Sequence, residues 1–257
     1  MKRILLLIAL IFFFFGISQE KSQDIADKLA NPVASMISVP VSSSLDVGVG
    51  PYNGSRLISN IQPVIPISIS KDINMITRTI VPFVDEKNIM GYGKSAFGTG
   101  DINLSVFLSP KNSKGLFWGA GPALVLPTAS EKFLGEGKWS LGPTSVFLKQ
   151  EHGQTFGLLG RQLWSFAGPN DRQNISQLYL QPFYTYNFKS GAGLGGNMEL
   201  TQDWISGYFT GYLNLTGSMI STFGKQPVSF ALGPRFPINS HTDGDWGLRA
   251  SITLIFK

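Results

Sequence analysis

The C-terminal segment shows the pattern that governs most of this chain, because apolar and polar side chains alternate strictly along it. Between residues 246 and 256, polar Arg249, Ser251 and Thr253 alternate with apolar Leu248, Ala250, Ile252, Leu254 and Phe256. A period of two places the two sets on opposite faces of a β-strand. The same alternation recurs at 101–109, 194–204, 208–219 and 228–236. The pattern predicts an all-β protein.

Further strands follow from the spacing of turn residues. From about residue 36 onward, segments rich in Val, Ile, Phe, Tyr and Thr are separated by clusters of Gly, Asn, Lys and Asp. Such clusters mark turns, and no helical periodicity interrupts the series. We predict about 12 strands, at 38–51, 57–70, 74–84, 100–110, 116–127, 139–150, 154–166, 175–188, 193–203, 208–222, 227–238 and 246–256. The serine run 42–44 breaks the apolar alternation of the first.

The gaps between these strands indicate an antiparallel transmembrane β-barrel. Short gaps (71–73, 111–115, 151–153, 189–192 and 223–226) alternate with mostly longer ones (85–99, 128–138, 167–174, 204–207 and 239–245). Barrels of the bacterial outer membrane have short periplasmic turns and longer extracellular loops. An even strand count places both chain ends on the turn side. We therefore expect an outer-membrane barrel of a Gram-negative bacterium.

A soluble β-sandwich or lipocalin-like barrel is the main rival fold. The predicted strands of roughly 10–14 residues exceed the ~5–6 usual in globular proteins and suit a tilted crossing of the bilayer. Only 14% of residues are charged, against ~25% in soluble domains. All five tryptophans fall at or beside a predicted strand end, as an interfacial aromatic girdle requires: Trp118, Trp139, Trp164, Trp204 and Trp246. These features favour the membrane barrel.

The N-terminus has the features of an export signal. Lys2 and Arg3 precede an apolar run from Ile4 to Phe15, and small residues allow cleavage after Ser18. The 12-residue run is shorter than the ~20 residues of a membrane-spanning helix, which argues against a single-pass anchor. We predict a signal peptide at 1–18, whose removal lowers the net charge from +5 to +3. This modest charge contains no long basic run, so a nucleic-acid partner is not expected.

A polar lead-in separates the signal from the first strand. Within 19–37, residues 25–30 could form a short helix that ends before Asn31-Pro32. The segment could be a periplasmic helix, a plug inside the barrel or a disordered lead-in. The predicted domains are thus the signal peptide, this segment at 19–37 and the barrel at 38–257.

Charged and polar side chains on the inward face are the candidate functional residues. Strand parity places eleven of them in the lumen: Arg78, Asp101, Asn103, Arg161, Gln177, Gln181, Glu199, Asp203, Asn214, Arg235 and Arg249. Ordered charge in a narrow pore selects solutes. Acids and arginines can equally pair across the lumen and close it, and a barrel of about 12 strands lies between filled and open sizes. Pore lining and structural plug have equal weight at this point.

Little else in the chain suggests chemistry. There is no cysteine, which excludes disulfides, thiol catalysis and Cys-based metal sites. The two histidines, His152 and His241, lie in predicted turns with no argued catalytic partner. Glycine-rich pieces such as 191–196 are not followed by a helix, so they do not form nucleotide-binding loops. We expect no cofactor, no metal and no enzymatic activity.

A series of short motifs resembles a known family. It includes Asn31-Pro32-Val33-Ala34, Gln62-Pro63-Val64-Ile65-Pro66, Gly98-Thr99-Gly100-Asp101-Ile102, Leu126-Pro127-Thr128-Ala129, Gly142-Pro143, Trp164-Ser165-Phe166-Ala167-Gly168 and Gln181-Pro182-Phe183. In this order, over nearly the whole mature chain, they resemble exported bacterial "transporter" proteins often mislabelled neuromedin U. That family is distantly similar to the outer-membrane proteins of the phenol meta-degradation pathway. The resemblance implies a barrel that passes small compounds, hydrophobic ones included, and brings no catalytic residues. Family members often end Phe-Pro-Lys, whereas this chain ends Phe256-Lys257.

Three functional hypotheses follow. The first is a passive outer-membrane channel or uptake barrel for small molecules, using the lumen and the loops at 85–99 and 128–138. The second is a non-transporting structural or adhesive barrel that acts through its outer loops. The third is a secreted soluble β-protein, with an enzyme further behind. The expected partners are outer-membrane lipid, a small solute and the barrel-assembly machinery. The solute, its direction of transport and the oligomeric state do not follow from the sequence.

Overall fold

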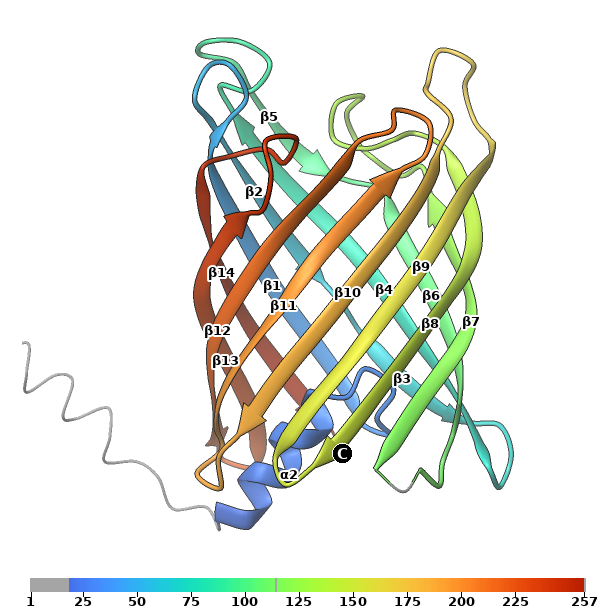
Figure 1. Cartoon of the computed structure of the whole chain (residues 1–257), viewed down its shortest axis with the longest axis vertical. Helices are drawn as coiled ribbons and strands as arrows, with labels where there is room; N and C mark the ends of the chain where they lie inside the picture. The colour runs from blue at the N-terminus through green and yellow to red at the C-terminus, as the bar shows by residue number, and fades with distance from the viewer. Residues whose placement is uncertain (1–18, 114, 257) are drawn as a thin grey trace, which may run out of the picture.

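The computed structural model describes residues 19–113 and 115–256, which form a closed antiparallel β-barrel with one short helix at the N-terminal end (Figure 1). The predicted signal peptide at 1–18 lies outside the described residues. The elements are α2 (Gln19–Leu29), β1 (Ile37–Val49), β2 (Gly54–Ile61), β3 (Val64–Ser68), β4 (Ile73–Lys87), β5 (Ser95–Thr99), β6 (Ile102–Pro110), β7 (Leu116–Leu126), β8 (Trp139–Glu151), β9 (Gln154–Ala167), β10 (Ser176–Asn187), β11 (Ala192–Asp203), β12 (Phe209–Phe223), β13 (Gln226–Pro237) and β14 (Trp246–Phe256).

The wall contains 12 crossings, which confirms the predicted fold. Two crossings are interrupted: β2 and β3 both pair with β4 on either side of Gln62-Pro63, and β5 and β6 both pair with β4 around Gly100-Asp101. The predicted loop at 85–99 was too long, because β4 continues to Lys87 and β5 begins at Ser95. The first crossing, β1, pairs with the last crossing, β14, from Ile37↔Phe256 to Val47↔Trp246. This pairing closes the barrel and leaves no free edge.

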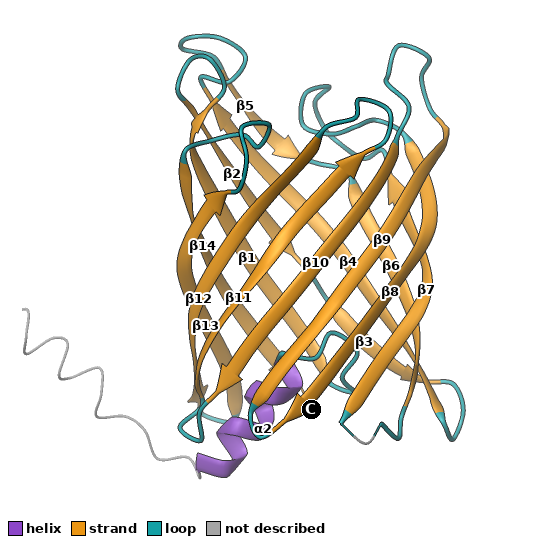
Figure 2. Ribbon diagram, viewed as in Figure 1, coloured by secondary structure: helices purple, strands orange, loops and turns teal. Residues whose placement is uncertain are grey.

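Turns and loops separate to the two ends of the barrel (Figure 2). One end carries the tight turns, the helix α2 and the C-terminus, and the other carries the longer connections such as 127–138 and 238–245. In an outer-membrane barrel the tight-turn end faces the periplasm. We use "periplasmic end" and "extracellular end" in this sense below.

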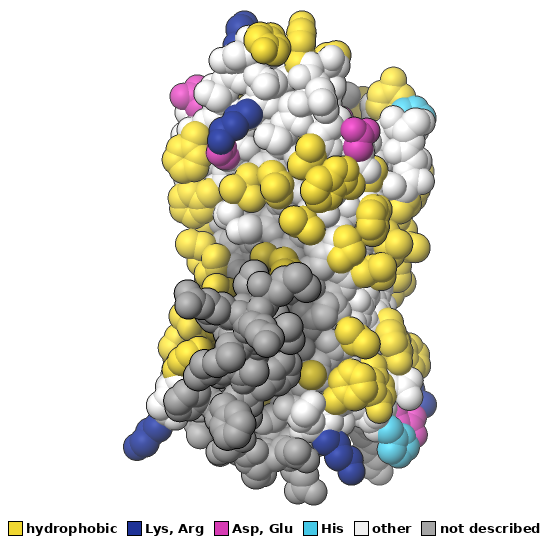
Figure 3. Space-filling model, turned by 90° about the vertical axis from the view of Figure 1, so that its left-hand side faces the viewer, with side chains coloured by type: hydrophobic (Ala, Val, Ile, Leu, Met, Phe, Trp, Pro, Cys, Tyr) yellow, Lys and Arg dark blue, Asp and Glu magenta, His cyan; other side chains and the backbone are white. Residues whose placement is uncertain are grey.

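The outward face of the wall is apolar. Leu248, Ile252 and Leu254 of β14 are exposed, while Thr253 between them is buried. In Figure 3, hydrophobic side chains cover the height of the visible wall and the charged ones gather near its two ends. All five tryptophans are exposed at or near strand ends. The apolar side chains of the alternating strands therefore lie on the outer face, as an outer-membrane barrel requires.

Glycine–proline pairs shape the middle of several strands. Proline cannot donate to the ladder, and the pairing of β12 with β13 skips from Asn214↔Arg235 to Gly217↔Leu232 around Pro234. A Cβ atom on the preceding Gly233 would lie 1.7 Å from the Leu215 carbonyl oxygen. Gly142 before Pro143 meets the Gln162 carbonyl oxygen in the same way, at 1.8 Å. At these points only glycine permits the close approach of neighbouring backbones.

We expect Gly233→Ala to lower the free energy of unfolding by about 1–3 kcal/mol, because a methyl group there would force the β12 backbone to move. Gly217→Ala is the matched control, since the nearest atoms to its added Cβ are 4.0 Å away. Urea titration of the refolded barrel in detergent, followed by the gel-mobility shift of the folded form, would measure both. Equal stability of the two variants would contradict the steric argument.

Candidate functional site

The lumen contains a network of charges joined by short hydrogen bonds. Arg235 Nε donates to Asp46 Oδ1 (2.9 Å) and its Nη1 donates to Glu199 Oε2 (2.6 Å). Arg249 Nη1 donates to the other oxygen of Glu199 (2.7 Å). Arg235 and Asp46 are among the least exposed side chains of the network, at 8% and 5%. Buried ion pairs of this kind persist because each charge is hydrogen-bonded as well as paired.

The residues of this network come from five neighbouring strands, β11 to β14 and β1. Asp46 comes from β1, Arg249 from β14, Arg235 from β13 and Glu199 from β11, and β12 adds Asn214, whose Oδ1 accepts from Arg235 Nη1 (2.9 Å). The ring of Tyr212, also on β12, lies 3.5 Å from the Arg235 guanidinium carbon. The guanidinium is thus held by two acids, an amide and an aromatic face. We call these residues the β11–β1 network.

Two further arginines of the lumen have no carboxylate partner among the described residues. Arg78 on β4 donates from Nη2 to Gln62 Oε1 (2.7 Å). Arg161 on β9 lies over the Tyr179 ring, with Cζ 5.5 Å from the ring centroid. The Nε atom of Arg161 is buried and has no hydrogen-bond partner within the described chain. The two sides of the lumen therefore differ. The arginines of the β11–β1 network are paired with carboxylates, whereas within the described chain Arg78 and Arg161 on the other side are not.

Other predicted lumen residues have different surroundings. Asp101 Oδ1 and Oδ2 accept from the backbone N–H groups of Ala129 and Gly137 (both 3.0 Å), so this carboxylate fastens the 127–138 loop. Asp203 Oδ1 accepts from the N–H groups of Ile205 and Ser206 and shapes the β11–β12 connection. Both were expected to line the lumen. They sit at the extracellular strand ends, where backbone donors of loops compete for them.

The remaining predicted lumen residues, Gln177, Asn103 and Gln181, lie at different heights along the barrel axis. Gln177 is opposite Asp203 at the extracellular end of β10. Asn103 on β6 is inside the wall, and its Oδ1 is buried without a partner among the described residues. Gln181 lines a cavity described below. The structure therefore brings together Glu199, Asn214, Arg235 and Arg249, while the other candidates occupy separate positions.

Loop carboxyls gather at the extracellular mouth. Burial raises the pKa of Glu136 in the 127–138 loop, and repulsion from Asp101 and Asp203 raises it further. Arg172 of the β9–β10 connection partly opposes this rise. The 127–138 loop is also held by Ser130 Oγ, which accepts from the N–H of Thr99 (3.0 Å). Several fixed contacts therefore hold the 127–138 loop at the mouth.

The N-terminal segment contacts the inside of the barrel wall at the periplasmic end. Gln23 Nε2 donates to the Asn187 carbonyl oxygen (2.9 Å), and Asn187 Nδ2 donates to Asp27 Oδ1 (2.8 Å). Gln150 Nε2 of β8 donates to the Asp27 carbonyl oxygen (2.6 Å). Asn74 Nδ2 of β4 donates to Ser35 Oγ (2.6 Å). We refer to residues 22–36 as the plug segment.

An apolar contact holds the plug segment to one wall. Val33, exposed to only 4%, packs in a cluster of inward-facing side chains from four strands: Ile76, Phe107, Val146, Leu148 and Leu159. Asn31 Oδ1 accepts from the N–H of Val33 (2.9 Å), which fixes the turn that presents it. These apolar residues face inward, whereas the sequence pattern predicted a polar lumen. Val33 of the plug segment packs against this apolar patch.

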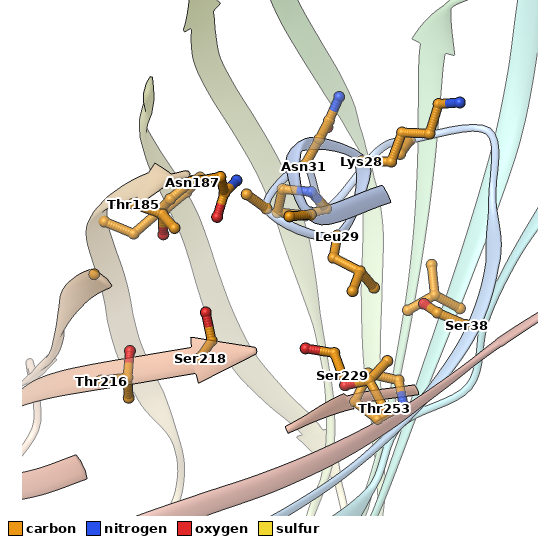
Figure 4. Close-up of a pocket in the computed structure, with 18 of the residues that line it drawn as sticks. Lys28, Leu29, Asn31, Ser38, Thr185, Asn187, Thr216, Ser218, Ser229 and Thr253 are labelled. Carbon is orange, nitrogen blue, oxygen red and sulfur yellow. The ribbon is translucent and has the colours of Figure 1, made fainter. Parts of the chain in front are cut away.

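A cavity of about 350 Å³ lies between the plug segment and strands β1 and β10–β14, and Leu159 of the apolar cluster also lines it. Figure 4 shows Leu29 and Asn31 of the plug segment on one side, with the hydroxyls of Ser218, Ser229 and Thr253 on the other. Arg78, Gln62 and Phe183 also line it. Its volume falls within the ~300–1,000 Å³ typical of small-molecule sites. The lumen can thus hold a small molecule beside the plug segment.

Sequence reasoning missed several residues of this site. Asp46 lies in the segment whose serine run obscured the alternation, yet the register places both Asp46 and Arg235 opposite Gly247 of β14. Val33 and Asp27 precede the strands, where period-two arguments do not apply. A signal for Asp46 was available: in 38–49 the even positions 42, 44 and 46 are all polar. No sequence signal reveals which wall the plug segment covers.

The described residues offer little for metal or acid–base chemistry. No group of three His, Asp or Glu side chains among them is arranged to hold a metal ion. His152 is exposed next to Glu151, and His241 stacks on Tyr208 (centroids 4.9 Å apart). No helix in the described part of the chain has the length and hydropathy needed to span a membrane.

Fold and lumen together define this chain as an outer-membrane-type β-barrel of 12 strands with a plug segment at its periplasmic end. It belongs to the family described as "Putative MetA-pathway of phenol degradation", whose model matches residues 54–249. The predicted resemblance to the phenol meta-pathway proteins is thereby confirmed. No curated protein sequence matches the chain significantly.

One solved structure shows a similar fold, and a second superposes less closely. The COG4313 outer membrane channel from Pseudomonas putida F1 superposes with a TM-score of 0.67 at 15% identity, covering 86% of this chain and 96% of that one. The CymD monoaromatic hydrocarbon channel gives a TM-score of 0.48 at 9% identity, covering 94% and 93%. At these identities the likeness concerns the fold.

We expect Glu199→Gln to lower the free energy of unfolding by about 3 kcal/mol, because it leaves two guanidiniums of the β11–β1 network without their shared carboxylate. Glu151→Gln, which removes an exposed carboxylate at the end of β8, should give no measurable change. Urea titration would measure both. Equal midpoints for the two variants would show that Glu199 contributes nothing beyond an exposed ion pair.

Docking of the plug segment should depend on pH through Asp27. Burial raises the pKa of this carboxyl, the Asn187 hydrogen bond partly lowers it, and Asp24 raises it again. A raised pKa means that the docked state favours the protonated form. Docking is therefore strongest below about pH 4 and weakens as the pH rises through the raised value. After correction for the intrinsic exchange rate at each pH, the hydrogen-exchange protection factors of residues 22–36 should be larger at pH 4 than at pH 7, and Asp27→Asn should reduce that difference. An unchanged difference in this variant would rule out Asp27 as its source.

Proposed function

We propose that this protein is a passive outer-membrane channel for small molecules, delivered there by the predicted signal peptide at 1–18. The cavity between the plug segment and the barrel wall is the observation that carries the proposal. Its lining combines hydroxyl, amide and apolar groups, which suits small solutes of mixed polarity. Membership of the phenol-degradation family and the fold shared with a COG4313 channel support it.

In this proposal a solute enters between the extracellular loops and passes the β11–β1 network. It then occupies the cavity and leaves when the plug segment moves. The plug segment is held by side-chain hydrogen bonds and one apolar cluster, and none of its residues adds a strand to the wall. It can therefore move without breaking the barrel. Displacement of residues 22–36 is the step that we expect to limit passage.

A reversible lock would test this step. A Cβ atom at Gly119 would lie 3.0 Å from Val33 Cγ1, a separation suited to a disulfide. The chain has no cysteine, so the double variant Val33→Cys/Gly119→Cys contains one possible pair. In liposome swelling with small neutral solutes, we expect the oxidised protein to pass solute at least about tenfold more slowly than the reduced protein. The single variants are the controls and should not respond to the reductant.

The second candidate is a non-transporting barrel, favoured by the dense β11–β1 network and by the plug segment fastened at the periplasmic end. It predicts that neither ions nor solutes pass, whatever the redox state of the lock. Such a result in planar bilayers and in swelling assays would overturn the channel proposal. Equal passage by the oxidised and reduced double variant would keep the channel and reject the plug segment as its gate.

A further inference from the structure

We propose that the lumen binds a small organic carboxylate at the cavity beside the plug segment, where Arg78 of the lining receives its charge and Arg161, two residues along β9 from the lining residue Leu159, assists from beside the cavity. The inference rests on the proposed channel function and names its solute class. It starts from a difference between the two walls. Arg235 and Arg249 are bound to Asp46 and Glu199, whereas Arg78 and Arg161 have no carboxylate partner among the described residues.

Both guanidiniums keep unused donors. A guanidinium has five N–H donors. Arg78 makes one side-chain hydrogen bond within the described chain, from Nη2 to Gln62 Oε1. The buried Nε of Arg161 has no hydrogen-bond partner there, and the guanidinium lies over the Tyr179 ring. An unsatisfied buried donor is costly, and a carboxylate is the acceptor that matches a guanidinium in both shape and charge.

The wall between the two arginines leaves room for their side chains. Register links Arg78 to Ser105, Ser105 to Ala123, and Ala123 to Gly142, while Arg161 is paired with Thr144 two residues further along β8. All four intervening positions carry small side chains. Long arginine side chains can lie over such a surface. The charges of Arg78 and Arg161 act on each other, and Tyr179 lies within electrostatic range of both. Arg249 and Glu199 of the β11–β1 network also act on Arg78 across the lumen.

The apolar residues below the two arginines favour an organic acid over an inorganic anion as the ligand. Along β4 the next inward residue below Arg78 is Ile76, and along β9 the next one below Arg161 is Leu159. Both belong to the apolar cluster that Val33 completes, with Phe183 packed against it. A charged site directly above an apolar surface favours a ligand with a carboxylate head and an apolar body.

The cavity has the matching charge. Arg78, Leu159 and Phe183 line it together with Lys28, and the lining residues within the described chain include no Asp or Glu. Lys28 is already paired with Asp24 (2.8 Å). Among the lining residues Arg78 is therefore the cation available to a ligand, while Arg161 lies beside the cavity, next to Leu159 along the inward face of β9. Glu199 across the lumen is bound to two other arginines. A bound carboxylate would therefore meet no acid in the cavity lining of the described chain, and Glu199 is the acid that acts on Arg78 from across the lumen.

Titration calorimetry of the full barrel in detergent tests the site without requiring passage. The probes are sodium benzoate and its neutral analogue benzyl alcohol. We expect benzoate to bind at least about tenfold more tightly, as charge-assisted hydrogen bonds predict. Arg78→Gln and Arg161→Gln should each weaken benzoate binding about tenfold and leave benzyl alcohol unchanged. Arg78→Lys should give an intermediate loss, because lysine keeps the charge without the planar fork.

Lys225→Gln is the matched control, since it removes one positive charge from an exposed turn and should not affect either probe. Equal affinity of the two probes for the unmodified protein would overturn the proposal, as would displacement of benzoate by equimolar chloride. Both outcomes can be observed even if an arginine variant does not fold. Benzoate binding without solute passage in swelling assays would reject the channel and keep the site. Passage of neutral solutes without benzoate preference would reject the site and keep the channel.

Discussion

Backbone hydrogen bonding is the constraint on which this structure depends. In a bilayer no water is available to the wall, so each N–H and C=O group must pair with a neighbouring strand. The pairing of β1 with β14 meets this requirement at the last open edge. Proline residues such as Pro234 have no N–H group to donate to a neighbouring strand. The glycine before them lets the neighbouring backbone come close. The closed wall then fixes which side chains share the lumen.

Closure makes the lumen a confined space in which charge must be balanced locally. The β11–β1 network achieves this with two acids and two arginines on adjacent strands. The opposite wall carries Arg78 and Arg161 without acids, above an apolar cluster sealed by Val33. A lumen that is balanced on one side and basic on the other has a built-in orientation for a charged solute. The plug segment and cavity lie below this asymmetric belt.

The plug segment shows how a polar lumen can contain apolar surface. Ile76, Phe107 and Leu159 face inward where alternation predicts polar residues, and Val33 removes them from water. Its hydrogen bonds reach the periplasmic turn regions of β8 and β10, through Gln150 and Asn187. The segment is therefore matched to one position in the barrel, although it adds no strand. This combination of specific contacts and independence from the wall is what a movable plug requires.

The sequence by itself determined the strands, their alternation and the barrel of 12 crossings, because period-two patterning and turn residues are local properties of the chain. It also placed Glu199, Asn214, Arg235 and Arg249 on one face. Only the tertiary structure decided that Asp46 joins them and that Asp101 and Asp203 serve loops. It also decided that residues 22–36 enter the lumen. Strand register, loop paths and the docking of a segment outside the strands depend on contacts between residues far apart in sequence, which local patterns do not encode.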